Sequence, residues 1–147
     1  LRRSFAFARY AEIATESDPR GLSPDVISAF ARNGLSRASL GVQVLDADVQ
    51  QRINRIQPRD SIEAAITGLR RAGVESINVD MMYGLPGQTL DHVVETATFA
   101  AMQDVDRVAV FGYAHVPWMK KHQKGIDTSE LPEGEARFSV WLPPSAG

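Results

Sequence analysis

The stretch SINVDMMYGLPGQT, residues 76–89, carries the clearest structural signal in this sequence. In its first half, apolar side chains alternate with Asn78 and Asp80, which is the period of a β-strand. The GLPG run at residues 84–87 cannot continue the strand, because its glycines and proline favour a tight turn. Thr89 is a suitable N-cap for the helical pattern that follows. The stretch therefore predicts a strand, a turn and a helix in succession.

The same order of strand and helix repeats on both sides of this stretch. The periodicity predicts strands at residues 10–16, 38–43, 76–82 and 108–113. It predicts helices after Ser23, at residues 46–54, at residues 60–73 and after Thr89. Asp60 and Glu63 are expected to form a capping box. The last helix is expected to bury an apolar face made of Leu90, Val93, Val94, Ala97 and Ala101.

Strands that alternate with helices imply right-handed βαβ units and a parallel sheet. Four strands are too few to close an eight-stranded barrel, which takes about 250 residues. The predicted fold class is therefore α/β, a partial (β/α) barrel of four parallel strands with helices outside. Such an arc leaves two sheet edges, and we expect the isolated chain to aggregate or to fold loosely.

The composition is that of an ordinary globular domain and excludes several classes of protein. Of the 147 residues, 44% are hydrophobic and 23% are charged, and the net charge is −2. We expect no nucleic-acid partner, because such surfaces need a clustered basic excess. We expect no membrane partner, because no apolar run approaches the roughly 20 residues that span a bilayer. The chain has no cysteine, which excludes any disulfide or thiolate metal site built from it alone.

Polar residues follow the predicted strands at the edge where parallel α/β sheets bind their ligands. Glu16, Gln43 and Asp80 lie at or near the ends of three different strands, and Ala114 follows the fourth. These groups would therefore converge on one rim. Carboxylates suit ribose hydroxyls, an amide suits a purine edge, and together they favour a nucleoside-like ligand.

Each of these residues also has a simpler explanation. Glu16 could be solvated before the turn at Asp18, and Gln43 could cap the next helix. Arg55 has the pattern of a surface residue, although a guanidinium at a helix end can bind a carboxylate. Asp80 is harder to explain, because an unpaired carboxylate in a strand buried on both faces is costly. No single residue here is a specific signal.

The segment after the fourth strand combines aromatic, apolar and basic residues. Trp118 and Met119 are expected to pack in the core, with a pocket for a flat macrocycle as the alternative. The lysines at 120, 121 and 124 are expected to form a solvated face, although their charge would also suit a polycarboxylate substrate.

Four segments resemble the oxygen-independent coproporphyrinogen III oxidases of the radical S-adenosylmethionine (SAM) superfamily. They are ASLGVQ at 38–43, VQQRINR at 49–55, NVDMMYGLPGQT at 78–89 and FGYAHVP at 111–117. Their order and spacing are similar to that family over residues 5–138. The resemblance implies a partial (β/α) barrel of the radical SAM type over residues 1–127. Residues 128–147 would form a tail whose start resembles the family and whose end is divergent and irregular.

The resemblance also implies cofactors, a reaction and site residues. The family holds a 4Fe-4S cluster and two SAM molecules. Glu16 matches a residue that contacts one SAM, and Gln43, Arg55, Asp80 and Ala114 match residues that contact the other. A radical formed from SAM removes hydrogen from propionates of coproporphyrinogen III, which lose carbon dioxide and become the vinyl groups of protoporphyrinogen IX in haem biosynthesis. No residue of this chain is assigned a catalytic role.

The chain departs from the family in two important respects. A Gly-rich segment that contacts SAM in the family is missing from this sequence. The cysteines that hold the cluster are absent, so we expect no metal ligand in this chain and no activity from it alone. We expect the chain to be the central part of a longer, cytoplasmic, monomeric enzyme that acts on a porphyrinogen. The related haem-chaperone branch is an alternative, as is a nonfunctional remnant produced by truncation or frameshift.

Overall fold

The fold is an arc of parallel strands with helices on one side. The computed structural model describes residues 6–132, apart from the side chain of His122. Residues 133–147 of the predicted tail lie outside the described residues. Within residues 6–132, no helix has the length and apolar character to cross a membrane.

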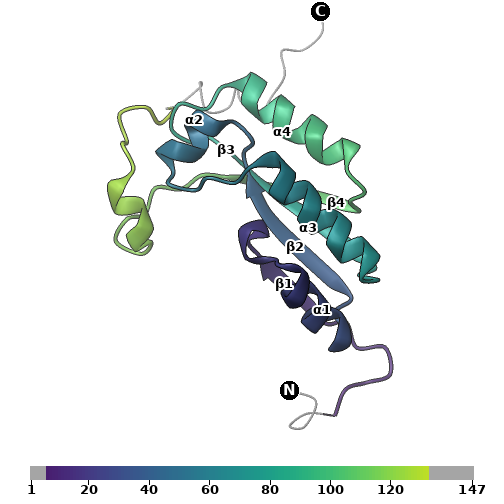
Figure 1. Cartoon of the computed structure of the whole chain (residues 1–147). Coiled ribbons are helices and arrows are strands. Elements are labelled where there is room, and N and C mark those ends of the chain that lie inside the picture. The colour runs from purple at the N-terminus through teal and green to yellow at the C-terminus, as the bar shows by residue number, and fades with distance from the viewer. Residues whose placement is uncertain (1–5, 133–147) are drawn as a thin grey trace, which may run out of the picture.

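The sheet contains the four predicted strands in chain order, and all neighbouring pairs are parallel (Figure 1). The strands are β1 (Ala14–Ser17), β2 (Arg37–Gln43), β3 (Ser76–Tyr83) and β4 (Arg107–Gly112). This arrangement confirms the α/β class and the partial (β/α) barrel. The first strand is shorter than predicted, because residues 9 and 10 form a turn and Tyr10 is 88% exposed.

The helices alternate with the strands. They are α1 (Pro24–Arg32), α2 (Ala47–Arg52), α3 (Arg59–Arg71) and α4 (Leu90–Met102), with short 3-10 helices η1 (Pro19–Gly21) and η2 (Lys121–Gly125). Side chains of α1, α3 and α4 share one hydrophobic cluster with the sheet, so these helices cover the same face (Figure 1). The helix α2 lies instead near the end of β2, where the chain leaves the sheet.

Strand alternation separates a buried face of the sheet from an open one. Leu40 and Val42 of β2 and Ile77 and Val79 of β3 are fully buried beneath the helices. Side chains in between point to the opposite face, which no described helix covers. We call it the open face, defined by Glu16, Ser39, Gly41, Asp80 and Phe111, which the strand register places on the same side.

Two details of the helix predictions are wrong. The helix α3 begins at Arg59 with Pro58 at its N-cap and no side-chain cap, so Asp60 and Glu63 do not form a capping box. The α4 face was also misassigned, since Val94 is 53% exposed and Ala101 is exposed.

The residues that α4 buries are Thr96, Phe99 and Ala100. Apolar residues occur on every side of this helix, so hydrophobicity alone does not select a face. Tertiary contacts select it instead. The Thr96 hydroxyl, which lies in the buried face, accepts a hydrogen bond from the Leu45 backbone N–H at 3.1 Å.

The turn after β3 has the structure that its sequence predicts. Gly84 and Gly87 adopt φ angles of 79° and 70°, in the left-handed region that favours glycine. The Gln88 amide closes the turn, accepting from the Leu85 N–H at 3.1 Å and donating to the Met82 carbonyl at 2.9 Å. Thr89 then caps α4, as predicted.

Candidate functional site

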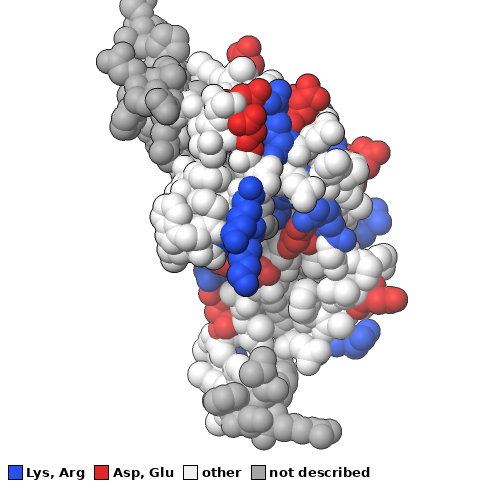
Figure 2. Space-filling view, turned by 90° about the vertical axis from the view of Figure 1, so that its left-hand side faces the viewer, with Lys and Arg blue, Asp and Glu red and all other residues white. Residues whose placement is uncertain are grey.

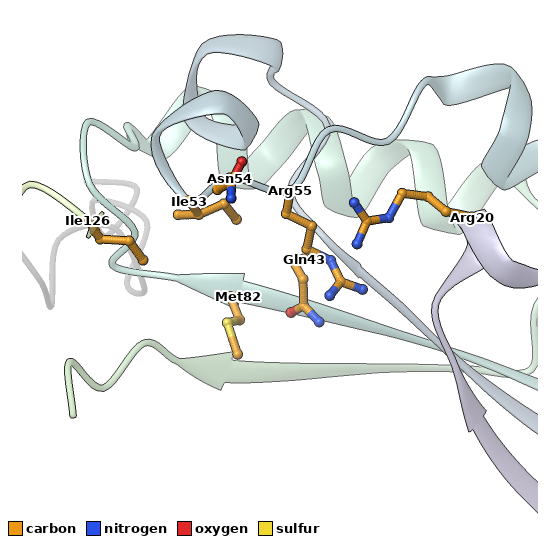
Figure 3. A pocket seen from close by; sticks show the side chains of 7 residues that line it. All are labelled: Arg20, Gln43, Ile53, Asn54, Arg55, Met82 and Ile126. Atoms are coloured by element: carbon orange, nitrogen blue, oxygen red, sulfur yellow. The ribbon is translucent and has the colours of Figure 1, made fainter. Parts of the chain in front are cut away.

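A pocket of about 280 Å³ lies at the carboxyl ends of the strands (Figure 3). It is bounded by the end of β2, the end of β3, the loop between α2 and α3, and the residue that follows η2. Its lining residues are Arg20, Gln43, Ile53, Asn54, Arg55, Met82 and Ile126. The location is the one at which parallel α/β sheets bind ligands.

Gln43 reaches this pocket through an irregular strand end. The pairing of β2 with β3 passes from Gly41–Asp80 to Gln43–Met81, which is a bulge, and Gln43 has a φ of 68°. A left-handed backbone is costly for a residue other than glycine, and such strain occurs most often at functional sites. The side chain lies over Gly41, and its buried Oε1 has no hydrogen-bond partner in residues 6–132.

Arg55 enters the pocket from the loop between α2 and α3. Its Nη2 donates to the Gly41 carbonyl oxygen at 2.8 Å and lies 3.2 Å from Asp18 Oδ2. Burial lowers the pKa of the Arg55 guanidinium, and the Asp18 carboxylate opposes this effect. The buried Nε finds no hydrogen-bond acceptor among the described residues. Buried polar atoms are normally satisfied, so this donor and Gln43 Oε1 suggest a polar ligand.

Asp80 and Glu16 give the open face a negative charge beside this pocket. Asp80 of β3 pairs with Gly41 of β2. Glu16 lies on β1, the strand on the other side of β2. Burial raises the pKa of Asp80, and the Glu16 carboxylate raises it further. Neither carboxylate forms an ion pair in the part of the chain that the structure describes. The pair can accept hydrogen bonds from hydroxyl groups or attract a cation.

Comparison with known proteins identifies the superfamily. The family model described as the Radical SAM superfamily matches residues 2–100. The chain belongs to the radical SAM superfamily.

Individual relatives of this radical SAM chain are much longer than it is. An oxygen-independent coproporphyrinogen III oxidase of Bradyrhizobium diazoefficiens is 47% identical over 137 residues, which is 93% of this chain and 30% of that protein. The uncharacterized protein y4hJ of Sinorhizobium fredii is 46% identical over 154 residues, which is 100% of this chain and 59% of y4hJ. The chain therefore spans under a third of that oxidase and over half of y4hJ.

A solved structure shows the same arrangement. The coproporphyrinogen III oxidase from Escherichia coli, a radical SAM enzyme, superimposes with a TM-score of 0.87 and is 36% identical. The match covers 95% of this chain and 32% of the E. coli chain. The partial (β/α) barrel of the radical SAM type is thereby confirmed.

The structure places the predicted SAM residues at different distances from the pocket. Gln43 and Arg55 line it, and Asp80 lies beside them across Gly41. Glu16 shares the open face, whereas Ala114 follows β4 and is not among the lining residues. The role of these residues as SAM ligands stays a prediction.

Asp18 is a site residue that the sequence did not reveal. Its Oδ2 accepts from Arg20 Nη2 at 2.6 Å and faces Arg55 Nη2 at 3.2 Å, so one carboxylate holds two guanidinium groups. The Arg20 hydrogen bond holds the pKa of Asp18 below its ordinary value. From sequence, Asp18 before Pro19 indicated only a turn. The carboxylate instead fixes the orientation of Arg55.

Two buried amides, Gln50 and Gln57, were also missed. The Gln50 amide donates to the Val44 carbonyl at 2.8 Å and accepts from the Gln57 N–H at 2.9 Å. The Gln57 amide donates to the Val42 carbonyl at 3.0 Å. These bonds tie the loop that carries Arg55 to the end of β2. Sequence offers little signal for them, because a glutamine on a short helix is most often exposed.

The described residues provide groups that suit SAM, but they provide no set of ligands for a metal ion. The unsatisfied amide and guanidinium atoms, two carboxylates and the pocket fit a ligand that carries hydroxyls, a purine and an amino-acid end. Within residues 6–132, no group of three or more His, Cys, Asp or Glu residues could hold a metal ion. With no cysteine in the chain, thiolate ligands for a 4Fe-4S cluster cannot come from it.

Proposed function

We propose that this chain is the SAM-binding central part of an oxygen-independent coproporphyrinogen III oxidase. The observation that carries the proposal is the meeting of Gln43, Arg55 and Asp80 around Gly41, with Gln43 Oε1 and Arg55 Nε buried and unpaired in the described chain. The similarity to oxidases of that name supports the same reaction. In this proposal the barrel ends at residue 127 and a tail follows.

Each residue would contact the part of SAM that its own side-chain chemistry suits. The Arg55 guanidinium suits the carboxylate of the methionine part of SAM. The Asp80 carboxylate suits ribose hydroxyls, and the Gln43 amide suits groups that both donate and accept. Ala114 would contribute its backbone. Glu16 would serve a second SAM on the same open face, so the proposal includes two molecules.

When bound, SAM supplies the oxidising chemistry that removes hydrogen from a propionate of coproporphyrinogen III, whose decarboxylation leads to protoporphyrinogen IX. The residues of this chain act by binding and orientation. Asp18 holds Arg55 in place, and the apolar side chains of Ile53, Met82 and Ile126 restrict water around the ligand. The 4Fe-4S cluster would take its ligands from outside this chain. As parts of the same proposal, the enzyme is a cytoplasmic monomer without nucleic-acid or membrane partners.

Calorimetric titration of the chain with SAM tests this proposal. We expect Arg55→Gln and Asp80→Asn each to weaken binding by tenfold or more, since each removes a charged hydrogen-bond partner worth about 1.5–3 kcal/mol. Arg71→Gln, which removes an exposed charge from the far end of α3, should leave binding unchanged. Glu16→Gln should affect only one of two binding events. Equal affinity of all variants, or no SAM binding by the folded chain, would refute the assignment.

A further inference from the structure

The segment between β4 and the pocket gathers a distinctive set of side chains. All three lysines of the chain, Lys120, Lys121 and Lys124, lie within it, next to Trp118 and Met119. Trp118 is 75% exposed and Met119 is 72% exposed, so the prediction that they pack in the core is wrong. We call these five residues the lysine platform. Large exposed apolar side chains beside concentrated charge indicate a binding surface.

The lysine platform is held in place by its own hydrogen bonds. The Val116 carbonyl accepts from the N–H groups of Met119 and Lys120, each at 2.9 Å. The buried Gln123 amide closes the base of the segment, donating to the Ala114 carbonyl at 3.0 Å and accepting from the Val116 N–H at 2.6 Å. Internal closure of this kind is typical of compact functional loops. The exposed side chains are therefore presented from a fixed backbone.

The platform adjoins the candidate SAM pocket. Its segment starts after Ala114, beyond β4, and ends at Ile126, which lines the pocket (Figure 3). Figure 2 looks at the end of the molecule where η2 lies, and basic side chains occupy the middle of that face. The platform is therefore joined to the pocket lining through Ile126, two residues after Lys124.

The charge of the platform is not neutralised by the described chain. Within residues 6–132, Lys120, Lys121 and Lys124 form no ion pair. Unneutralised ammonium groups attract and orient anionic ligands. Exposed tryptophan and methionine side chains next to three lysines in the sequence suit a ligand that is apolar in its body and anionic at its rim.

We propose that the lysine platform binds the tetrapyrrole substrate, with Trp118 and Met119 against the macrocycle and the lysines at its propionate carboxylates. This inference rests on the proposed function, because the tetrapyrrole is the substrate of the oxidases to which the chain is similar. A tetrapyrrole with four propionates has the required apolar body and anionic rim. The platform would hold it next to the SAM pocket, where its side chains react.

Tryptophan fluorescence gives a direct test. Trp141→Phe leaves Trp118 as the one tryptophan, and coproporphyrin III serves as a stable tetracarboxylate probe. We expect saturable quenching that weakens on the order of tenfold in the Lys120→Gln, Lys121→Gln, Lys124→Gln triple variant, as three exposed ion pairs allow. A control triple variant, Arg32→Gln, Arg59→Gln, Arg71→Gln, removes the same charge from α1 and α3 and should quench normally. The tetramethyl ester of the probe should bind more weakly.

Chemical cross-linking tests the same contact without any substitution. A carbodiimide joins a probe carboxylate to a lysine amine as an amide, and the water removed converts the reagent to a urea. We expect mass spectrometry to find the probe on Lys120, Lys121 or Lys124. The absence of such an adduct, or unchanged quenching in the lysine triple variant, would overturn the proposal.

A membrane surface is the competing partner for exposed Trp, Met and Lys side chains. Vesicles with phosphatidylserine should leave Trp118 emission unchanged, and binding to them with loss of porphyrin quenching would overturn the proposal. The SAM titration is independent of this test. Failure of the platform with intact SAM binding would remove this inference alone, whereas failure of SAM binding would remove the proposed function.

Discussion

Arg55 donates a 2.8 Å hydrogen bond to the carbonyl oxygen of Gly41, and the contact depends on Gly41 having no side chain. A Cβ atom at Gly41 would lie 3.0 Å from Arg55 Nη2 and 2.9 Å from Gln43 Nε2. A side chain at position 41 would therefore displace the ends of the Gln43 and Arg55 side chains from their present places. A single backbone position thus organises both pocket residues.

Gly41→Ala should disturb the site more than the fold. The added methyl group pushes Gln43 and Arg55 apart, and we expect SAM affinity to fall by tenfold or more while overpacking lowers the free energy of unfolding by about 1–3 kcal/mol. Gly21→Ala is the matched control, since a Cβ there meets nothing within 4 Å. Isothermal titration and urea unfolding measure the two effects. Unchanged SAM affinity in Gly41→Ala would contradict the close approach.

Gln43→Gly should stabilise the fold while weakening the site. Glycine relieves the left-handed φ of 68°, so the free energy of unfolding should rise by up to about 1 kcal/mol. The lost amide should weaken SAM binding roughly fivefold, since a hydrogen bond contributes about 1 kcal/mol. Gln43→Asn is the control, because asparagine tolerates this backbone but its amide is shorter. A less stable Gln43→Gly variant would show that no strain is stored there.

Asp80 should make the fold less stable as the pH rises. Its pKa is raised above the ordinary 3.8, first by burial and then by Glu16, so the folded state holds its proton more tightly than the unfolded state does. The ionised form therefore costs stability, a cost that develops between 3.8 and the raised pKa and persists at neutral pH. Asp80→Asn should unfold at a higher urea concentration than the unchanged chain at pH 7. The difference should shrink toward about pH 4.

Asp18 should change the stability of the fold with pH in the opposite direction to Asp80, and it therefore serves as a control. Its pKa is lowered from 3.8, chiefly by the Arg20 hydrogen bond, so its contribution is present above 3.8 and is lost as the pH falls through the lowered value. Asp18→Asn should therefore be less stable than the unchanged chain at pH 7. If Asp18→Asn and Asp80→Asn shift stability in the same direction at neutral pH, the assigned electrostatics are wrong.

The parts of this structure that follow from local patterns were predictable from the sequence. Alternation located β3, the GLPG turn ended it, and Thr89 began α4, because each signal lies within a few neighbouring residues. Parallel topology then placed Gln43 and Asp80 at the same edge. The strand-end rule thus selected two residues that the structure brings close together, without any tertiary information.

The parts that depend on distant contacts were not predictable. The buried face of α4 is set by Thr96, whose hydroxyl accepts from Leu45, a residue far away in sequence. The exposure of Trp118 depends on how Gln123 folds its loop. Asp18 takes part in the site only because the fold brings Arg55 to it. Composition and periodicity carry no information on such pairs.

Gln50→Leu should have two effects: it should destabilise the chain, and it should displace Arg55. The substitution leaves the Val44 carbonyl and the Gln57 N–H buried without partners, which costs about 1–3 kcal/mol for each group. The neighbouring residue Gln51 is exposed. As a control, Gln51→Leu should change the free energy of unfolding by no more than about 0.5 kcal/mol. Urea denaturation compares the two variants. Equal stability would mean that the buried amides do not hold the loop.

The edges of the described sheet should make the chain self-associate. β1 and β4 each pair with one neighbour among the described strands, and Val108 and Phe111 of β4 are 38% and 50% exposed. Unpaired parallel edges with apolar side chains recruit further strands. The mass measured by light scattering should therefore rise with concentration, and Val108→Lys should suppress the rise by placing a charge on the edge. Val94→Lys adds the same charge on exposed α4 and should have little effect. A concentration-independent monomer with a sharp two-state melt would show that these edges do not drive association.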